Sequence, residues 1–125
     1  MIEYTVKVNK IGETFWKLNG KRHREDGPAI EFADGRKSWY INGELHRQDG
    51  PAIEFVDGDK RWYIDGKRHR EDGPAIEYAD GEEQWYLNGV KLTKEQHKIK
   101  TSIVKDHTIK EISEILGYNV RIVKE

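Results

Sequence analysis

The chain has 125 residues, of which 36% are charged and 35% apolar, so the sequence indicates a single domain with a small core. Its 22 basic and 23 acidic side chains give a formal net charge of −1, which excludes a global field that would draw the chain to DNA or anionic lipid. The absence of cysteine excludes disulfides and thiolate metal sites, and the lack of a signal segment or of any run of about 18 apolar residues leads us to expect a cytoplasmic protein.

The first expected element is an N-terminal capping half-repeat over residues 1–15. The segment 2–15, IEYTVKVNKIGETF, predicts a strand, a loop at Asn9 to Gly12 and a second strand that continues to Trp16. The strand near Tyr4 to Val8 would then form the edge of the sheet, where it could pair with a second copy of the chain.

Residues 16–92 contain three and a half copies of a 23-residue unit. The full copies read WKLNGKRHREDGPAIEFADGRKS (16–38), WYINGELHRQDGPAIEFVDGDKR (39–61) and WYIDGKRHREDGPAIEYADGEEQ (62–84), and a fourth stops at Leu92. Each copy has an Asn-Gly or Asp-Gly pair after the aromatic run and an Asp-Gly pair after the apolar run. Such pairs between β-forming residues predict hairpins, because a type I′ turn needs two positive φ angles.

Alternation within the predicted strands assigns the side chains to two faces. We expect Trp, Ile and Phe on the buried face, with Tyr and Glu on a partly solvated one. Identical groups repeated along a sheet make an extended contact surface, and Tyr is favoured at interfaces. The alternative is a solvated face without a binding role. The candidate protein-binding residues are Tyr40, Tyr63, Tyr86, Glu31, Glu54 and Glu77.

Two further columns, one of His and one of Arg, lie beside the first turn of each copy. Equivalent positions would be about 10 Å apart along the array, too far to share one ion, so no metal site is expected. A two-residue turn would pair Trp39 with His46, which predicts a structural His packed on the Trp layer and hydrogen-bonded to backbone or to a loop carboxylate. We expect the KRHRED loops to be self-neutralised and to hold the Asp-Gly-Pro turn. The alternative is a small anionic or nucleotide ligand bound by Arg24, Arg47, Arg70, His23, His46 and His69.

Residues 93–125 predict a C-terminal cap of two helices and a strand. Thr93 to Gln96 has the spacing of a capping box and opens a helix to about Val104. A second box at Thr108 to Glu111 opens a helix that Gly117 ends, and residues 118–123 alternate as a strand. We expect the helices to cover the last hairpin, and whether they are a cap or a second binding site stays open.

The core of the unit, NGKRHREDGPAIEYADG, resembles the MORN repeat, which also has about 23 residues. The match covers residues 16–92: the His column and the turn glycines Gly20, Gly43, Gly66 and Gly89 coincide with the family pattern, whereas Arg24, Arg47 and Arg70 stand where the family has Gly. The resemblance implies a mainly β fold, an elongated antiparallel meander of MORN-like hairpins, that mediates protein contacts, dimerisation or membrane-surface attachment. The segment HREDGPAIEY and the C-terminal segment IKEISEILGYNVRIVKE are also similar to sequences of small bacterial and phage proteins. This similarity suggests host-directed binding in a bacterial or phage-infected cell.

No sequence pattern for catalysis is present, since the chain lacks a P-loop, a serine elbow and an HExxH motif. A repeat also makes each group in triplicate, whereas catalysis needs one unique constellation. We therefore expect no catalytic residue and no cofactor. The leading hypothesis is a non-enzymatic protein-binding module, a phage or bacterial inhibitor or adaptor. The alternatives are a sponge for a small anionic ligand and a self-assembling structural protein; a homodimer stays open, and nucleic acid or membrane partners are disfavoured.

Overall fold

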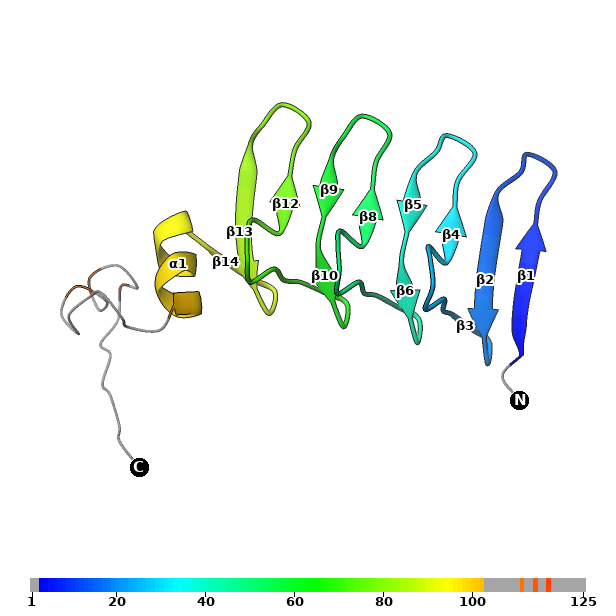
Figure 1. Cartoon of the computed structure of the whole chain (residues 1–125), viewed down its shortest axis with the longest axis horizontal. Coiled ribbons are helices and arrows are strands. Elements are labelled where there is room, and N and C mark those ends of the chain that lie inside the picture. The colour runs from blue at the N-terminus through cyan, green and yellow to red at the C-terminus, as the bar shows by residue number, and fades with distance from the viewer. Residues whose placement is uncertain (1–2, 103–110, 112–113, 115–116, 118–125) are drawn as a thin grey trace.

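The structure is a computed structural model that describes residues 3–102 and the single residues 111, 114 and 117. The hairpins stand side by side in an elongated row, with the N-terminal strand at one end and a helix at the other (Figure 1). The strands of the first half are β1 (Tyr4–Val8), β2 (Thr14–Leu18), β3 (Lys21–Arg22), β4 (Ile30–Glu31), β5 (Lys37–Ser38), β6 (Tyr40–Ile41) and β7 (Glu44–Leu45). The remaining elements are β8 (Ile53–Glu54), β9 (Lys60–Arg61), β10 (Tyr63–Ile64), β11 (Lys67–Arg68), β12 (Ile76–Glu77), β13 (Glu83–Leu87), β14 (Val90–Leu92) and α1 (Lys94–Ser102).

The strands form two tiers. The upper tier is one antiparallel sheet in the order β1-β2-β4-β5-β8-β9-β12-β13, and the lower tier consists of the short hairpins β2/β3, β6/β7, β10/β11 and β13/β14 (Figure 1). Backbone bonds also join neighbouring lower hairpins, for example from the Gly43 N–H to the Arg22 carbonyl at 2.8 Å. The expected mainly β, antiparallel meander with a small C-terminal helix is therefore confirmed. In the described part of the chain, no helix is long and apolar enough to cross a membrane.

The two turns of each copy are of different types. In the lower turn both residues have positive φ, as at Asn42 (52°) and Gly43 (83°), which confirms the predicted two-residue type I′ hairpin. In the upper turn only the glycine has a positive φ, as at Gly35 (97°). There the Phe32 N–H donates to the Arg36 carbonyl and the Gly35 N–H to the Phe32 carbonyl, so the loop has three residues and ends in a glycine bulge.

The predicted assignment of the faces is wrong in one respect. Ile76 lies opposite Gln84, so by strand alternation it shares its face with Tyr86, whereas Trp85 lies on the other face with Glu83. Ala75, Ile76 and Tyr86 form a buried cluster. The error lies in the register between the apolar strand and the Trp strand, because a slip of one residue moves every side chain to the opposite face.

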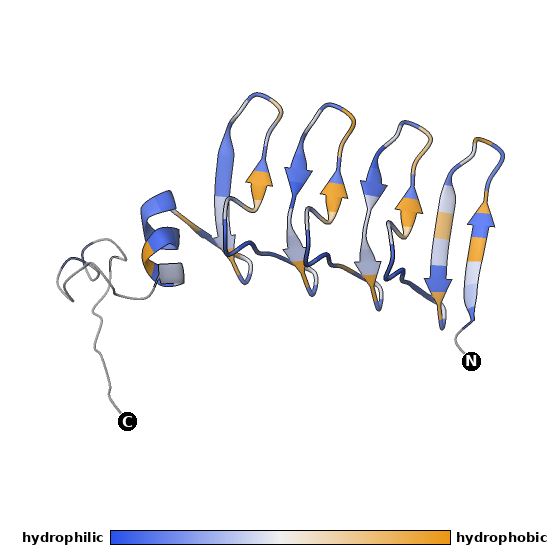
Figure 2. Ribbon diagram, viewed as in Figure 1, coloured by the Kyte–Doolittle hydropathy of each residue, from blue (hydrophilic) through white to orange (hydrophobic). Residues whose placement is uncertain are grey.

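The buried apolar residues of the array lie mainly in and beside the short strands β4, β8 and β12. Figure 2 shows the apolar strands β4, β8 and β12 alternating with the hydrophilic strands β5 and β9. The largest fully buried side chains of the described residues are Ile30 and Ile76. Because this core is thin, the polar contacts between and within copies must contribute much of the order.

The C-terminal helix begins as predicted. The Thr93 N–H donates to Gln96 Oε1 at 2.9 Å and the Gln96 N–H donates to Thr93 Oγ1 at 3.0 Å, which is a reciprocal capping box. The described helix ends at Ser102, and its predicted end at Val104 lies outside the described residues. The same holds for most of the predicted second helix and for the terminal strand over 118–123.

Candidate functional site

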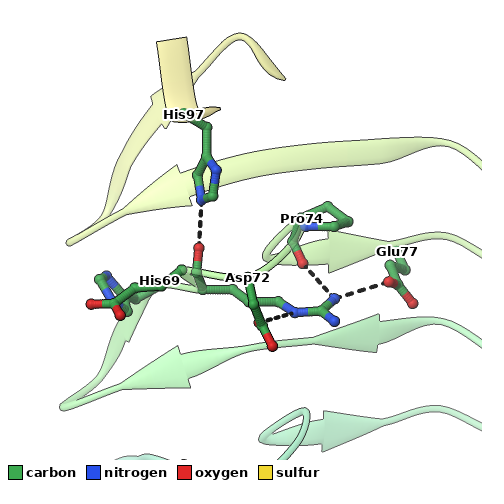
Figure 3. Close-up of polar contacts among 7 residues, drawn as sticks. His69, Asp72, Pro74, Glu77 and His97 are labelled. Carbon is green, nitrogen blue, oxygen red and sulfur yellow. Dashed lines mark hydrogen bonds and ion pairs between the residues drawn. The ribbon is translucent and has the colours of Figure 1, made fainter. Parts of the chain in front are cut away.

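Each full copy contains a set of contacts around one arginine, which we call the arginine clamp. In the third copy, the Arg70 guanidinium lies 3.9 Å from the Trp62 ring centre. Its Nε donates to Asp72 Oδ1 at 3.0 Å, and its Nη1 donates to the Pro74 carbonyl at 3.1 Å and to Glu77 Oε1 at 2.9 Å (Figure 3). The clamp therefore holds the Asp-Gly-Pro turn from within one copy, and confirms that the loop neutralises itself.

The second clamp repeats all of these contacts, whereas Arg24 in the first copy bonds to Asp26 and to the Pro28 carbonyl but not to Glu31. Arg24 and Arg47 each lie 3.9 Å from the ring of their own tryptophan and donate to Asp26 and Asp49. The Arg24 guanidinium beside Asp26 lowers the pKa of that carboxyl. The arginine column thus contributes to the framework in all three copies. Its side chains are only 20–22% exposed.

The histidine column connects one copy to the next. His46 Nδ1 accepts a hydrogen bond of 3.0 Å from the Asp65 N–H, 19 residues further on, in the type I′ turn of the next copy. His23 and His69 accept in the same way from Asn42 and Asn88, at 2.9 Å each. The His46 N–H donates to the Trp39 carbonyl, which confirms the predicted pairing of these two residues. Among the described residues no group of three metal-ligating side chains occurs.

The Tyr and Glu columns lie in different parts of the array: Tyr40 and Tyr63 belong to the lower hairpins, and the Glu column belongs to the upper strands β4, β8 and β12. Tyr86 is buried, and Arg68 connects it to Tyr63 by donating to both hydroxyls, at 3.2 and 3.4 Å. The hydrogen bond to Tyr63 raises the pKa of Arg68. Tyr40 is half-buried under Arg22, and Glu31 is also half-buried. Glu54 and Glu77 belong to the arginine clamps. The structure therefore does not bring the two columns together on one surface.

Two grooves open between consecutive loops. Groove A has a volume of about 860 Å³, and groove B has about 810 Å³. Groove A is lined by residues 24–28, Trp39, Ile41 and residues 46–49. Groove B is lined by residues 47–51, Trp62, Ile64 and residues 69–72. The linings of the two grooves are related by the 23-residue period, and Gln48 belongs to both.

The rims of the grooves are acidic. In groove A the carboxylates of Glu25, Asp26 and Asp49 stand against two clamped guanidiniums, and these carboxylates are 75–87% exposed. The same holds in groove B for Asp49, Glu71 and Asp72. Because the guanidiniums are turned inward and the carboxylates outward, each groove presents negative charge to solvent.

The third loop has no loop of a fourth copy beside it, and α1 covers it. His97 of α1 lies with Nε2 2.6 Å from the Arg70 carbonyl oxygen (Figure 3). The centre of the His97 ring is 4.8 Å from that of the Trp85 ring. His97 and Ile99 are buried. Gly73 and Pro74 of the third loop are buried too, while the equivalent glycines and prolines of the first two loops are only half-buried.

The grooves were not among the sequence predictions, although the sequence carries a signal for them. The tryptophans and the Asp-Gly-Pro turns recur with the same period, so any space between them must recur as well. The end of the fourth copy at Leu92 marks the point where a helix replaces a loop.

Comparisons of this chain with protein-family models, with curated proteins and with solved structures give no match. The resemblance to MORN repeats is therefore a prediction that these comparisons neither support nor oppose, and the function must be argued from the geometry of the site.

Proposed function

We propose that this protein is a non-enzymatic protein-binding module that acts through the row of grooves between its repeat loops. One observation carries the proposal: grooves A and B are equivalent, open and lined by matched residues of consecutive copies. Repeat arrays bind through such periodic surfaces, because each copy adds the same contact at a fixed spacing. A role as an inhibitor or adaptor in a bacterial or phage-infected cell fits this mode of action.

The composition of the grooves favours a protein partner over a reaction. Each groove contains an aromatic ring, an isoleucine, a proline and exposed carboxylates, which are the components of an interface with an apolar centre and a polar rim. The histidine in each groove uses Nδ1 as an acceptor for a backbone N–H of the next copy, and each arginine is held in its clamp. These groups are thus engaged in the framework.

The proposal is tested by placing a photo-cross-linking amino acid at Gln48, which lines both grooves and is exposed. The matched control carries the same group at Val56, which is 66% exposed on an upper loop. After irradiation in the expressing cells, we expect one defined protein adduct from position 48 and none from position 56. Equal labelling from both positions, or none from position 48, would refute a binding role of the grooves.

A second candidate function is self-assembly through β1. This strand pairs only with β2 in the described residues, and Val6 and Val8 on it are 44% and 67% exposed. An open, apolar edge strand can add a second copy of the chain. Sedimentation velocity of the wild type and of Val6→Lys tests it: we expect a dimer that the substitution dissociates, and a strict monomer at high concentration removes this candidate.

The remaining alternative is a small anionic or nucleotide ligand held by the Arg and His columns. The inward-facing clamps and acidic rims weigh against it. A thermal-shift series with nucleotides, repeated on an Arg47→Lys variant, tests this alternative directly; a stabilisation of the wild type that the variant loses would favour it.

A further inference from the structure

The face of the upper sheet that lies opposite to the clamp glutamates carries a place where the copies differ from one another. We infer that this place, between Arg36 and Arg61 and beside Phe55, binds the phosphate group of a phosphate monoester. The site lies outside both grooves, and it is independent of the proposed protein-binding function.

Arg36 and Arg61 flank the same aromatic ring. Ile53 of β8 lies opposite Ser38 of β5 on one side and opposite Arg61 of β9 on the other. Arg36 precedes Ser38 by two positions, so strand alternation puts both arginines on the face of Ile53. The guanidinium carbons of Arg36 and Arg61 lie 5.8 Å and 4.9 Å from the Phe55 ring centre. The two positive groups are therefore close to one another on one surface.

Neither guanidinium has an acceptor in the part of the chain that the structure describes. The clamp arginines each bond to an aspartate, and Arg68 bonds to two tyrosine hydroxyls. By contrast, the Nε atoms of Arg36 and Arg61 are buried without a hydrogen-bond partner, and within the described residues neither side chain forms an ion pair. Their other guanidinium nitrogens are not buried in this way, so they can donate to a ligand. Two uncompensated positive charges of this kind favour an anion between them.

The carboxylates of the neighbouring loops are engaged by backbone groups. Asp34 accepts from the Arg36 N–H at 2.9 Å, and Asp57 accepts from the Asp59 N–H at 3.0 Å. Asp59 in turn accepts from the Ala79 N–H at 2.7 Å. These three acidic side chains hold the upper loops and leave the two guanidiniums without a counter-charge.

The arginine at position 36 also interrupts a repeated hydrogen bond. In the N-terminal hairpin and in the second copy, this column holds a carboxylate that accepts from a backbone N–H 20 positions further on: Glu13 from Ala33 at 3.2 Å, and Asp59 from Ala79 at 2.7 Å. A guanidinium cannot accept, and the equivalent N–H, that of Val56, has no acceptor among the described residues. An anion beside Arg36 would take the place of the missing carboxylate and accept from the Val56 N–H.

The donors favour a phosphate monoester over a carboxylate. They are two guanidiniums and one backbone N–H, and they come from three separate segments of the chain. A carboxylate has one charge and two oxygens in a plane. A phosphate monoester carries a charge of about −1.5 to −2 at pH 7 and three acceptor oxygens, and arginine binds it through paired N–H groups. Its charge and its number of oxygens therefore match the two cations and the third donor.

The experiment follows binding by NMR on the full, isotope-labelled chain at constant ionic strength. The probes are inorganic phosphate and phenyl phosphate, with acetate as the carboxylate control. We expect both phosphates to shift the Val56 amide and the Nε–H signals of Arg36 and Arg61, with dissociation constants of about 1 mM. Acetate should bind about tenfold more weakly. The Nε–H signals of the clamp arginines provide an internal control and should not move.

A phosphoserine peptide is the third phosphate probe, because the same group also occurs on modified proteins. Binding of the peptide that is tighter than that of phenyl phosphate would identify a phosphorylated protein as the source of the group. Equal or weaker binding would identify a small ligand. Both results agree with the chemistry of the site.

Arg36→Glu is the decisive variant, because it introduces the residue that the N-terminal hairpin carries in this column, at Glu13. The new carboxylate can accept from the Val56 N–H, as Glu13 does from the equivalent Ala33 N–H. We therefore expect the variant to melt at the same temperature as the wild type or at a higher one, and phosphate binding to be lost.

The matched pair of neutral variants is Arg61→Gln and Lys60→Gln. Glutamine is the residue that the third copy carries in the column of Arg61, at Gln84. Lys60 is exposed and adjacent in β9, so its side chain points to the opposite face of the sheet. We expect affinity about tenfold weaker in Arg61→Gln and changed by less than about twofold in Lys60→Gln.

Four outcomes would overturn the inference. These are no shift with either phosphate, equal affinity for phosphate and acetate, unchanged phosphate affinity in Arg36→Glu, and shifts at the clamp arginines in place of Arg36 and Arg61. The last result would place the anion at the Arg and His columns instead. None of the four affects the cross-linking experiment at position 48, which tests the proposed function separately.

Discussion

The first two loops and the third loop share one sequence pattern and one internal geometry, but they have different surroundings. The side of the first loop that carries Pro28 opens on groove A and the same side of the second loop opens on groove B, whereas on the third loop this side is covered by α1. In each copy the guanidinium lies 3.9 Å from the tryptophan ring centre and bonds to an aspartate and to a proline carbonyl, and the second and third clamps add a bond to a glutamate. The comparison shows that each loop is shaped by contacts within its own copy, so the cover adds burial without changing the conformation.

The largest test of this comparison is to remove the cover. We expect Ile99→Asp to lower the free energy of unfolding by about 3 kcal/mol or more, because Ile99 is 3% exposed and a charge there would have no partner. The substitution should also open the third loop, which hydrogen exchange of the Gly73 amide would detect. The exposed neighbour Lys98 provides the control: Lys98→Asp should cost less than about 0.5 kcal/mol. Unchanged protection of Gly73 in Ile99→Asp would contradict the role of α1.

The second test breaks the connection between copies and leaves the loop intact. We expect His46→Ala to cost about 1.5 kcal/mol, because the exposed Asp65 N–H loses its acceptor and the imidazole, whose side chain is only 17% exposed, loses its packing. Urea denaturation measures this loss. Gln48→Ala, on the exposed loop of the same copy, is the control and should be close to neutral. Equal stability of the His46 and Gln48 variants would show that the histidine does not join the copies.

The third test acts within one copy. Arg47→Lys keeps the charge but loses the planar group that lies over Trp39 and that also bonds to the Pro51 carbonyl and to Glu54. We expect urea denaturation to show a loss of about 1 kcal/mol in the free energy of unfolding. Lys37→Arg, an exposed change on β5, is the matched control. A lysine variant as stable as the wild type would mean that the clamp needs only a positive charge.

The smallest expected effect is on the way in which thermal stability depends on pH. The Arg24 guanidinium lowers the pKa of Asp26 in the folded chain, so this carboxylate stabilises the fold at pH values above its ordinary pKa of about 4. That contribution is lost as the pH falls through the lowered value. We expect thermal stability to fall less steeply between about pH 4 and pH 2 in Asp26→Asn than in the wild type. An identical slope for both proteins would show that the pairing has no thermodynamic weight.

Local geometry explains which features were predictable from the sequence. The Asn42-Gly43 turn, the pairing of Trp39 with His46 and the capping box at Thr93 and Gln96 depend on residues close in the chain, and all three were predicted. The upper turn differs because the Asp34 carboxylate accepts from the Arg36 N–H at 2.9 Å and so favours a three-residue loop.

The features that escaped prediction depend on register and on contacts between copies. The faces were assigned by alternation within each strand, which does not say which residue of the next strand stands opposite. Ile76 pairs with Gln84, and this pairing puts Trp85 on the face opposite to Ile76, whereas Trp62 of the preceding copy still packs against the cluster of Ala75, Ile76 and Tyr86. The grooves arise between the loops of consecutive copies, so a pattern within one copy does not reveal them.

The hydrogen bond from each histidine to the turn of the next copy also limits how the number of grooves can change in evolution. Every link joins a residue to one 19 positions ahead, and the same link recurs after each 23-residue copy. Deleting residues 39–61 would join Ser38 to Trp62 and bring His23 to the turn at Asp65, so that the link is restored with one groove fewer. Gain or loss of a whole copy therefore adds or removes one groove, whereas an insertion of a different length would break the hydrogen bond between the histidine and the next turn.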